Sequence, residues 1–399
     1  MVSPLKWLEQ VFQVARYSLM TIPQRLGSAA SAAFGIAGVV AVLVGVLSIA
    51  QGFQQTMKSS ASPEGAIVLR DGAGSEMMSG LGRETTRVVA DTVGVRQGDE
   101  GPLSSAELFV IINLPKRTTG TDANVPLRGV EPAAFEVRDT LEIIEGRRFE
   151  WGRNEVIIGV GAAREFAGLD LGGAIEVGAD DWRVVGVFTA DGGVAESEVW
   201  TDAKLLQAAY RRGESFQSVY TKLESVDAFE AFKDALTSDP RVSVDVLTQD
   251  AYYAGQSKML SAMINGIGVV ITVLMAIGAI FGALNTMYTA VSARTREIAT
   301  LRALGFKSGP VVISVLAESL LLALLGGTVG GVVAYLAFDG FKAATLNLQS
   351  FSQVAFAFDV TPTLVVLGIV CAAFIGLVGG LFPAIRAMRM PIADALRAS

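Results

Sequence analysis

Ser292-Ala-Arg-Thr-Arg-Glu-Ile-Ala-Thr-Leu-Arg-Ala-Leu-Gly305 is a short basic stretch that lies between two long apolar segments. The segment before it, 259–293, has no charged residue in 35 positions, and the segment after it, 308–338, has only Glu318. Because charged residues are costly inside lipid, this stretch cannot lie in the bilayer. We therefore expect a cytoplasmic helix over 294–307 that connects two membrane spans.

The connector combines apolar and basic residues in a helical pattern. Ile298, Leu301 and Leu304 recur at i, i+3 and i+6, which predicts that they share one helix face. A loop that only fixes membrane orientation needs charge but no apolar face. The pattern therefore favours a surface that docks another protein. The charged residues around this face are Arg294, Arg296, Glu297 and Arg302, and Gly305 follows it.

The composition is that of a membrane protein with a large polar insertion. Of the 399 residues, 51% are hydrophobic and only 18% are charged. Four uncharged or nearly uncharged runs, within 26–57, 259–293, 308–338 and 360–385, are long enough to cross a bilayer. This predicts a membrane protein with four transmembrane α-helices and a large α+β extracytoplasmic domain inserted between helices 1 and 2.

Several kinds of chemistry are excluded by the residues themselves. The chain has no histidine and one cysteine, Cys371, so intrachain disulfides, histidine general bases and Cys/His zinc sites cannot form. The stretch Gly305-Phe-Lys-Ser308 is the nearest match to a phosphate-binding loop, but it lacks the upstream glycine and the Gly-Lys pair. We therefore expect no catalytic residue, no metal site and no cofactor on this chain.

The charges are distributed asymmetrically along the chain. Residues 52–258 carry 21 basic and 33 acidic side chains, whereas the clusters at 1–25, 294–307 and after Ile385 are basic. Short basic segments stay in the cytoplasm. We expect both termini on the cytoplasmic side of the membrane, residues 53–257 on the opposite side, and no binding of nucleic acid by this acidic domain.

The pattern along the chain predicts nine consecutive parts. These are an amphipathic interfacial helix in contact with membrane lipid (1–25), a first span (26–52), the extracytoplasmic domain (53–257), a stalk and second span (258–293), the cytoplasmic helix (294–307), a third span (308–338), an outer loop (339–359), a fourth span (360–385) and a cytoplasmic tail (386–399).

The sequence at the C-terminal end of the large domain predicts a β-α-β unit. Strands over 219–223 and 242–247 flank a helix over 227–238, and a strand over 66–70 is expected to complete their sheet. The glycine-rich middle, about 129–202, is expected to form an inserted β-rich subdomain. Its short strands are predicted over 155–160, 174–177 and 183–188, and another is predicted before it over 107–112.

Within the spans, small residues and one carboxylate stand out. Glycines spaced four residues apart allow membrane helices to approach closely, within the protomer or across a dimer. Glu318 anchors the helix near the inner interface in one interpretation and couples ions or protons in the other. The glycines are Gly278 and Gly282, Gly326 and Gly330, Gly327 and Gly331, and Gly376 and Gly380.

Three motifs and the order of the parts give the chain a family resemblance. The motifs are Arg294-Thr-Arg-Glu-Ile-Ala-Thr-Leu-Arg-Ala-Leu-Gly305, Glu318-Ser-Leu-Leu-Leu-Ala-Leu-Leu-Gly-Gly327 and Pro383-Ala-Ile-Arg-Ala-Met-Arg-Met-Pro391. With one span, a large outer domain and three further spans, the chain resembles permeases of the MacB/FtsX/LolC-like ABC transporter family. The resemblance implies that 294–305 lies at the junction with a separate ABC ATPase subunit, which carries ATP and Mg²⁺.

The same resemblance implies a permease that passes ATP-driven motion to its outer domain, in order to export or extract a substrate outside the membrane. It also implies a dimer with a second copy or a paralogue, and a periplasmic adaptor or substrate protein is a further possible partner. A regulatory transducer that controls an extracytoplasmic partner such as a cell-wall hydrolase is the alternative. A receptor without any ATPase is a third, which the apolar face of 294–305 disfavours.

Overall fold

The computed structural model describes residues 13, 26–304, 308–347, 349–389 and 391, and the chain divides into two compact units. The helical unit comprises 1–51, 263–341 and 358–399, and the α+β unit comprises 52–262 and 342–357. The amphipathic helix expected over 1–25 lies outside the described residues, apart from Gln13.

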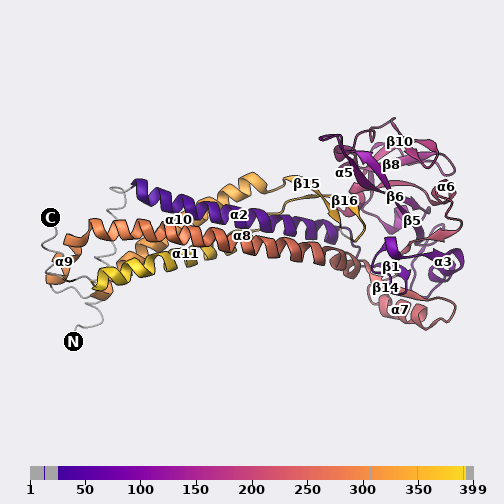
Figure 1. The fold of residues 1–399 in the computed structure, drawn as a ribbon. Helices are drawn as coiled ribbons and strands as arrows, with labels where there is room; N and C mark the ends of the chain where they lie inside the picture. Colours follow the sequence, from indigo (N-terminus) through magenta and orange to yellow (C-terminus); the bar gives the residue numbers. More distant parts are fainter. Residues whose placement is uncertain (1–12, 14–25, 305–307, 348, 390, 392–399) are drawn as a thin grey trace. The chain divides into compact units, whose positions relative to one another are not determined.

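Four long apolar helices dominate the helical unit, and their length and composition suit membrane crossing, as the four-span fold class predicted. Figure 1 shows them running side by side. The longest has 45 residues, or about 68 Å at the usual helical rise, so it exceeds the thickness of a bilayer. The helices are α2 (Leu26–Ser59), α8 (Gln249–Ala293), α10 (Ser308–Phe338) and α11 (Pro362–Arg389).

The core of the helical unit is built from small and β-branched residues. Val40 and Val44 of α2 pack with Ala323 of α10 and with Ala372 and Ile375 of α11, and residues of α8 lie against this cluster. Small side chains let helices approach closely in lipid, where dispersion contacts replace the hydrophobic effect as the force that holds helices together.

A single mixed sheet organises the α+β unit. Its ten strands follow the order β14-β1-β13-β5-β6-β11-β8-β10-β7, and β9 pairs with β10 outside this path. The strands are β1 (Gly65–Arg70), β5 (Ser104–Pro115), β6 (Asp122–Val130), β7 (Glu142–Gly146), β8 (Glu155–Gly159), β9 (Ala174–Val177), β10 (Asp180–Thr189), β11 (Val199–Asp202), β13 (Ser218–Lys222) and β14 (Val244–Thr248).

Short helices and strands complete this unit. The helices are η2 (Glu76–Met78), α3 (Arg83–Ala90), α4 (Ala134–Val137), α5 (Val160–Glu165), η3 (Val194–Ser197), α6 (Ala203–Ala209) and α7 (Ala228–Ser238). Two small ladders join β2 (Leu81–Gly82) to β12 (Ser215–Phe216) and β3 (Gln97–Gly98) to β4 (Gly101–Pro102).

The predicted β-α-β unit is present, and the first strand of the domain completes it. β1 lies between β13 and β14 and runs antiparallel to both, so β13 and β14 are parallel to each other, with α7 as their crossover helix. Phe232 and Leu236 of α7 are buried against Val68 and Val219 of the sheet. The β-rich middle of the domain continues this sheet through β5 and β6.

The region 339–359, expected to be a plain loop, contains a β-hairpin of β15 (Lys342–Asn347) and β16 (Ser352–Ala357) that belongs to the α+β unit. The backbone N–H of Ala355 donates to Ser197 Oγ at 2.8 Å, and Asn124 Nδ2 donates to the carbonyl of Phe351 at 2.7 Å. Phe356 packs edge-on against Phe53. Alternating apolar residues in 352–357 were the available signal for a strand.

Candidate functional site

The predicted cytoplasmic connector forms a separate short helix, α9 (Thr295–Ala303). The chain breaks away from α8 at Arg294, whose backbone N–H donates to the carbonyl of Val291 at 3.2 Å. Glu297 lies in the first turn of α9 and Arg302 in the last, so both charges complement the helix dipole. This local sequence therefore favours a helix of about this length.

One face of α9 packs into the helical unit. Ile298 is only 8% exposed and joins a buried cluster with Val291, Val311 and Ala384 from three neighbouring helices. Leu304 is 73% exposed instead. The expectation that Ile298 and Leu304 present one apolar face is therefore wrong, because i and i+6 lie about 120° apart around a helix.

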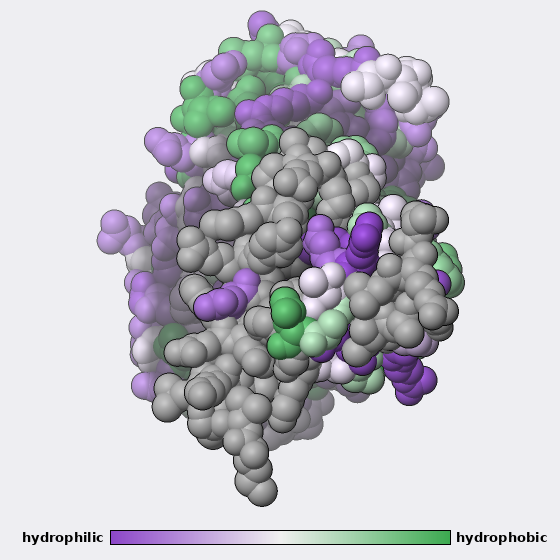
Figure 2. All heavy atoms as spheres, turned by 90° about the vertical axis from the view of Figure 1, so that its left-hand side faces the viewer, coloured by the Kyte–Doolittle hydropathy of each residue, from purple (hydrophilic) through white to green (hydrophobic). Residues whose placement is uncertain are grey.

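The exposed face of α9 carries a different set of residues. Figure 2 views the molecule from the end that carries α9, and shows hydrophilic side chains beside a small hydrophobic group. The exposed positions recur at i, i+1, i+4, i+7 and i+8, the spacing of one helix face. They are Arg296, Glu297, Thr300, Ala303 and Leu304. This set, called the α9 face below, is where a partner could bind.

Two further residues of the predicted docking set lie partly or wholly outside the described part of the structure. The backbone of Leu301 belongs to α9, but its side chain is not described, and Gly305 is not described at all. The side chain of Arg302 is half-buried.

The intramembrane carboxylate is paired with the connector. Glu318 of α10 lies 3.3 Å from Arg294, and their side chains are 6% and 13% exposed. An opposite charge at this distance offsets part of the cost of burying a carboxylate in a span. This geometry supports the structural interpretation of Glu318, in which it holds the start of α9 against α10.

Two of the predicted glycines lie directly against the backbone of a neighbouring helix. A Cβ atom added to Gly326 or Gly330 would lie 2.5 Å or 2.4 Å from the carbonyl oxygen of Ala33 or Ala37 in α2. Since the obstructing atoms are backbone, larger residues require the helices to separate.

The other glycines divide between a helix contact and an open face. Added Cβ atoms at Gly327, Gly331, Gly376 and Gly380 would all meet side chains across the α10–α11 contact at less than 3.0 Å. Gly278 and Gly282 are exposed on α8, with no described atom within 4 Å of an added Cβ. The four-residue spacing alone did not separate these two cases.

The α+β unit contains a buried charge cluster that the sequence did not reveal. The guanidinium of Arg128 donates to Glu198 and Glu107 at 2.8 Å and to Glu76 at 2.7 Å. Arg138 donates to Glu107 and stacks 3.9 Å from the ring centre of Tyr220. These residues are far apart in sequence and follow no motif, so only the fold brings them together.

The charges in this cluster stabilise one another. Burial alone would raise the pKa of Glu198, but the charge and hydrogen bonds of Arg128 lower it below its ordinary value. Burial likewise opposes the charge on Arg128, but Glu198 and Glu76 raise the pKa of that guanidinium well above its ordinary range. Breaking such a buried network usually costs several kcal/mol.

Across the part of the chain that the structure describes, no group of three or more His, Cys, Asp or Glu side chains could hold a metal ion.

Comparison with known protein families gives two matches that together cover most of the chain. Residues 29–239 match the model of the MacB-like periplasmic core domain, and residues 269–392 match the FtsX-like permease C-terminal model. The first match alone extends over more than half of the chain. The order of the two matches agrees with the α+β unit and the helices that follow it.

Two of the relatives are distant but match nearly the whole chain. The macrolide export ATP-binding/permease protein MacB of Bdellovibrio bacteriovorus is 27% identical, over 90% of this chain and 57% of its own length. The uncharacterized ABC transporter permease YknZ of Bacillus subtilis is 25% identical, over 91% of this chain and 92% of its own length. The chain thus spans just over half of that MacB relative.

Among solved structures, the extracellular domain of the transporter YknZ from Gram-positive bacteria matches 46% of this chain and 99% of its own, with 17% identity and a TM-score of 0.35.

Proposed function

Because this chain belongs to the MacB-like and FtsX-like family of ABC transporter permeases, we propose that it is the membrane subunit through which a separate ATPase acts on the extracytoplasmic side. The observation that carries this proposal is the α9 face, which combines a basic, an acidic and a large apolar exposed residue on one short helix between two spans. Membrane-buried helices have no need of such a surface.

The proposed partners follow from this role. An ABC ATPase subunit that binds ATP and Mg²⁺ docks on the α9 face, and a second permease copy or paralogue completes a dimer. We place both termini and α9 in the cytoplasm of a bacterium and residues 53–257 outside it, since the short segments with excess Lys and Arg are 1–25, 294–307 and the tail. A periplasmic adaptor or substrate protein is a further possible partner.

The proposed mechanism is mechanical. Closure of the ATPases on ATP displaces α9, whose start is paired to α10 through Arg294 and Glu318. Two unbroken helices, α2 and α8, each contain residues of both units and therefore carry displacement along their axes. The hairpin that joins α10 to α11 belongs to the α+β unit and supplies a third connection.

We propose that the work done is export or extraction of a substrate that the protein meets outside the membrane. One relative, MacB of Bdellovibrio bacteriovorus, is named as a macrolide exporter. Among the described residues, Glu318 is the one Asp, Glu, Lys or Arg side chain well inside a span, so a polar solute pathway through the helices finds little support.

Affinity purification of the tagged full-length chain tests this proposal. We expect an ATP-hydrolysing protein to be recovered with it in mild detergent, and its ATPase activity to respond to added substrate. A regulatory transducer would instead require a protein partner for this response. If no ATPase is recovered even after crosslinking, the permease proposal is wrong.

A further inference from the structure

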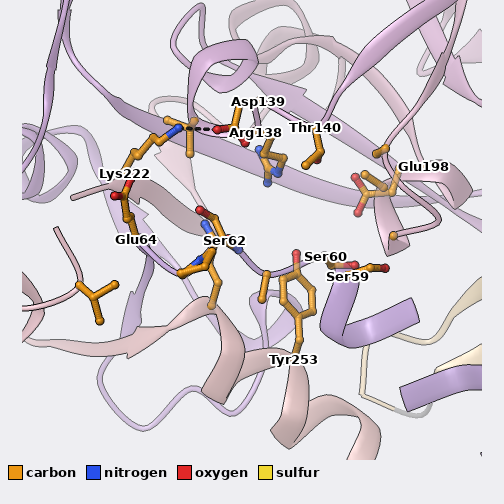
Figure 3. Close-up of a pocket in the computed structure, with 18 residues that line it drawn as sticks. Ser59, Ser60, Ser62, Glu64, Arg138, Asp139, Thr140, Glu198, Lys222 and Tyr253 are labelled. Carbon is orange, nitrogen blue, oxygen red and sulfur yellow. Dashed lines mark hydrogen bonds and ion pairs between the residues drawn. The ribbon is translucent and has the colours of Figure 1, made fainter. Parts of the chain in front are cut away.

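A cavity lies within the α+β unit, at the place where five of its segments meet. Its volume is about 330 Å³, and it is lined by residues 59–64, by the turn after α4, by the segment around η3, and by Lys222, Gln249 and Tyr253. Figure 3 shows charged and hydroxyl side chains facing it from these different segments. Its size is at the lower end of small-molecule sites.

An ion pair crosses the edge of this cavity. Lys222 Nζ on β13 lies 2.6 Å from Asp139 Oδ2 in the turn after α4, and Figure 3 marks this contact. The Lys222 side chain is 11% exposed and that of Asp139 is 60% exposed. Among the described residues Asp139 is the only partner of this ammonium, which can donate three hydrogen bonds.

Gln249 also belongs to the lining, but its side-chain amide is not available to a ligand. Its Oε1 accepts from the backbone N–H of Ser62 at 3.0 Å. Its Nε2 has no hydrogen-bond partner among the described atoms, but it is fully buried and lies against Gly65. The ion pair of Lys222 and Asp139 therefore supplies the contacts considered for a ligand.

The other charged groups of the lining are paired with residues that are not part of the lining. Arg138 is bound to Glu107, Glu198 to Arg128, and Glu64 to Arg96 at 2.8 Å. The hydroxyl of Tyr253 lies 3.3 Å from the hydroxyl of Tyr220, so it is already hydrogen-bonded. Among the described ion pairs, Lys222 and Asp139 are therefore the pair that has both of its charges in the lining.

The charge of the lining limits what can enter. A lone anion would bind Lys222 but would be repelled by Asp139, and a lone cation would face the opposite problem. A molecule with both charges inserts into the ion pair without leaving either residue uncompensated. We propose that this cavity binds a small zwitterion, an amino acid or a short peptide, with its carboxylate on Lys222 and its ammonium on Asp139.

Calorimetric titration of the full-length chain in lipid nanodiscs tests this site. Glycylglycine and glycine are the probes, and acetate and ethylamine are matched controls that carry only one of the two charges. We expect saturable binding of glycylglycine and no saturable binding of either control. No ATPase is needed, so failure here is distinguishable from failure of the proposed function.

Two variants locate the binding. Asp139→Asn removes the ammonium contact and is expected to weaken glycylglycine binding about tenfold or more. Val226→Trp adds a large side chain in the cavity lining, where Val226 is 58% exposed, and is expected to abolish binding. Val93→Trp is the matched control, because Val93 is 65% exposed but is not part of the lining.

Three results would overturn the proposal. These are the absence of binding by any probe to the wild-type chain, binding of acetate as tight as that of glycylglycine, and unchanged binding in a folded Val226→Trp variant. The last comparison does not depend on whether Asp139→Asn folds, since Val226 lies at the surface and forms no part of the ion pair.

Discussion

Arg294 lies 3.3 Å from Glu318, and this contact joins the residue that precedes α9 to the interior of the membrane helix α10. Both side chains are largely buried. The pair therefore provides a direct physical connection between the proposed docking helix and the spans, and the account of force transfer depends on it.

A double-mutant cycle measures this connection. Arg294→Gln and Glu318→Gln should each lower the thermal unfolding midpoint. The decrease in the double variant should be smaller than the sum of the two single decreases. We expect a coupling of about 0.5–3 kcal/mol, the usual range for residues in contact. Additive effects would show that the two charges do not stabilise each other.

The glycines of α10 should be unequal in their tolerance of larger residues. Gly330→Ala should destabilise the chain by about 1–3 kcal/mol, because the new Cβ would lie 2.4 Å from the carbonyl oxygen of Ala37. Gly278→Ala on α8 is the matched control, since an added Cβ there meets no described atom within 4 Å. Thermal unfolding in the same detergent compares the two; equal losses would contradict this packing.

Arg128 should be essential to the α+β unit. Arg128→Met leaves Glu76, Glu107 and Glu198 without their shared guanidinium, and breaking such a buried pair usually costs about 3–5 kcal/mol. Arg241→Met is the control, because its ion pair with Asp239 lies at the surface and should contribute little to stability. Urea unfolding followed by tryptophan fluorescence reports both; a small effect at Arg128 would show that the cluster is not stabilising.

The same cluster predicts a dependence of stability on pH. Since the pKa of Glu198 is lower in the folded chain than its ordinary value, its contribution is fully present above the unfolded pKa of about 4.3. It is lost as the pH falls from there through the folded pKa.

Replacement of Glu198 isolates this effect. Below about pH 4.3, the free energy of unfolding of Glu198→Gln should decrease less steeply with falling pH than that of the wild type, by up to about 1.4 kcal/mol per pH unit. Urea unfolding at each pH measures this difference. Parallel profiles for the variant and the wild type would assign the acid sensitivity to other carboxylates.

The spans and their order could be predicted from the sequence, because a helix that crosses a lipid bilayer must be a long run of mostly uncharged residues. The β-α-β unit was also predictable, since α7 and its flanking strands follow local periodicity. The hairpin at 342–357 was missed because its packing on Ser197 and Asn124 is a long-range contact.

The candidate site was predictable in position but not in orientation. The basic residues located α9, yet the neighbouring helix ends, which bury Ile298 and leave Leu304 exposed, decided which face is free. The Arg128 cluster and the cavity beside Lys222 and Asp139 could not be predicted, because each is assembled from residues of several distant segments.

The most direct test of the central claim is site-specific photocrosslinking in living cells. A photoreactive residue placed at Leu304, which is 73% exposed on α9, is compared with one at Leu336, which is 78% exposed near the other end of α10. If an ATPase docks on α9, we expect a covalent adduct with an ATP-binding protein at Leu304 and none at Leu336. Absence of this adduct at Leu304, or equal adducts at both positions, would contradict docking of an ATPase on α9.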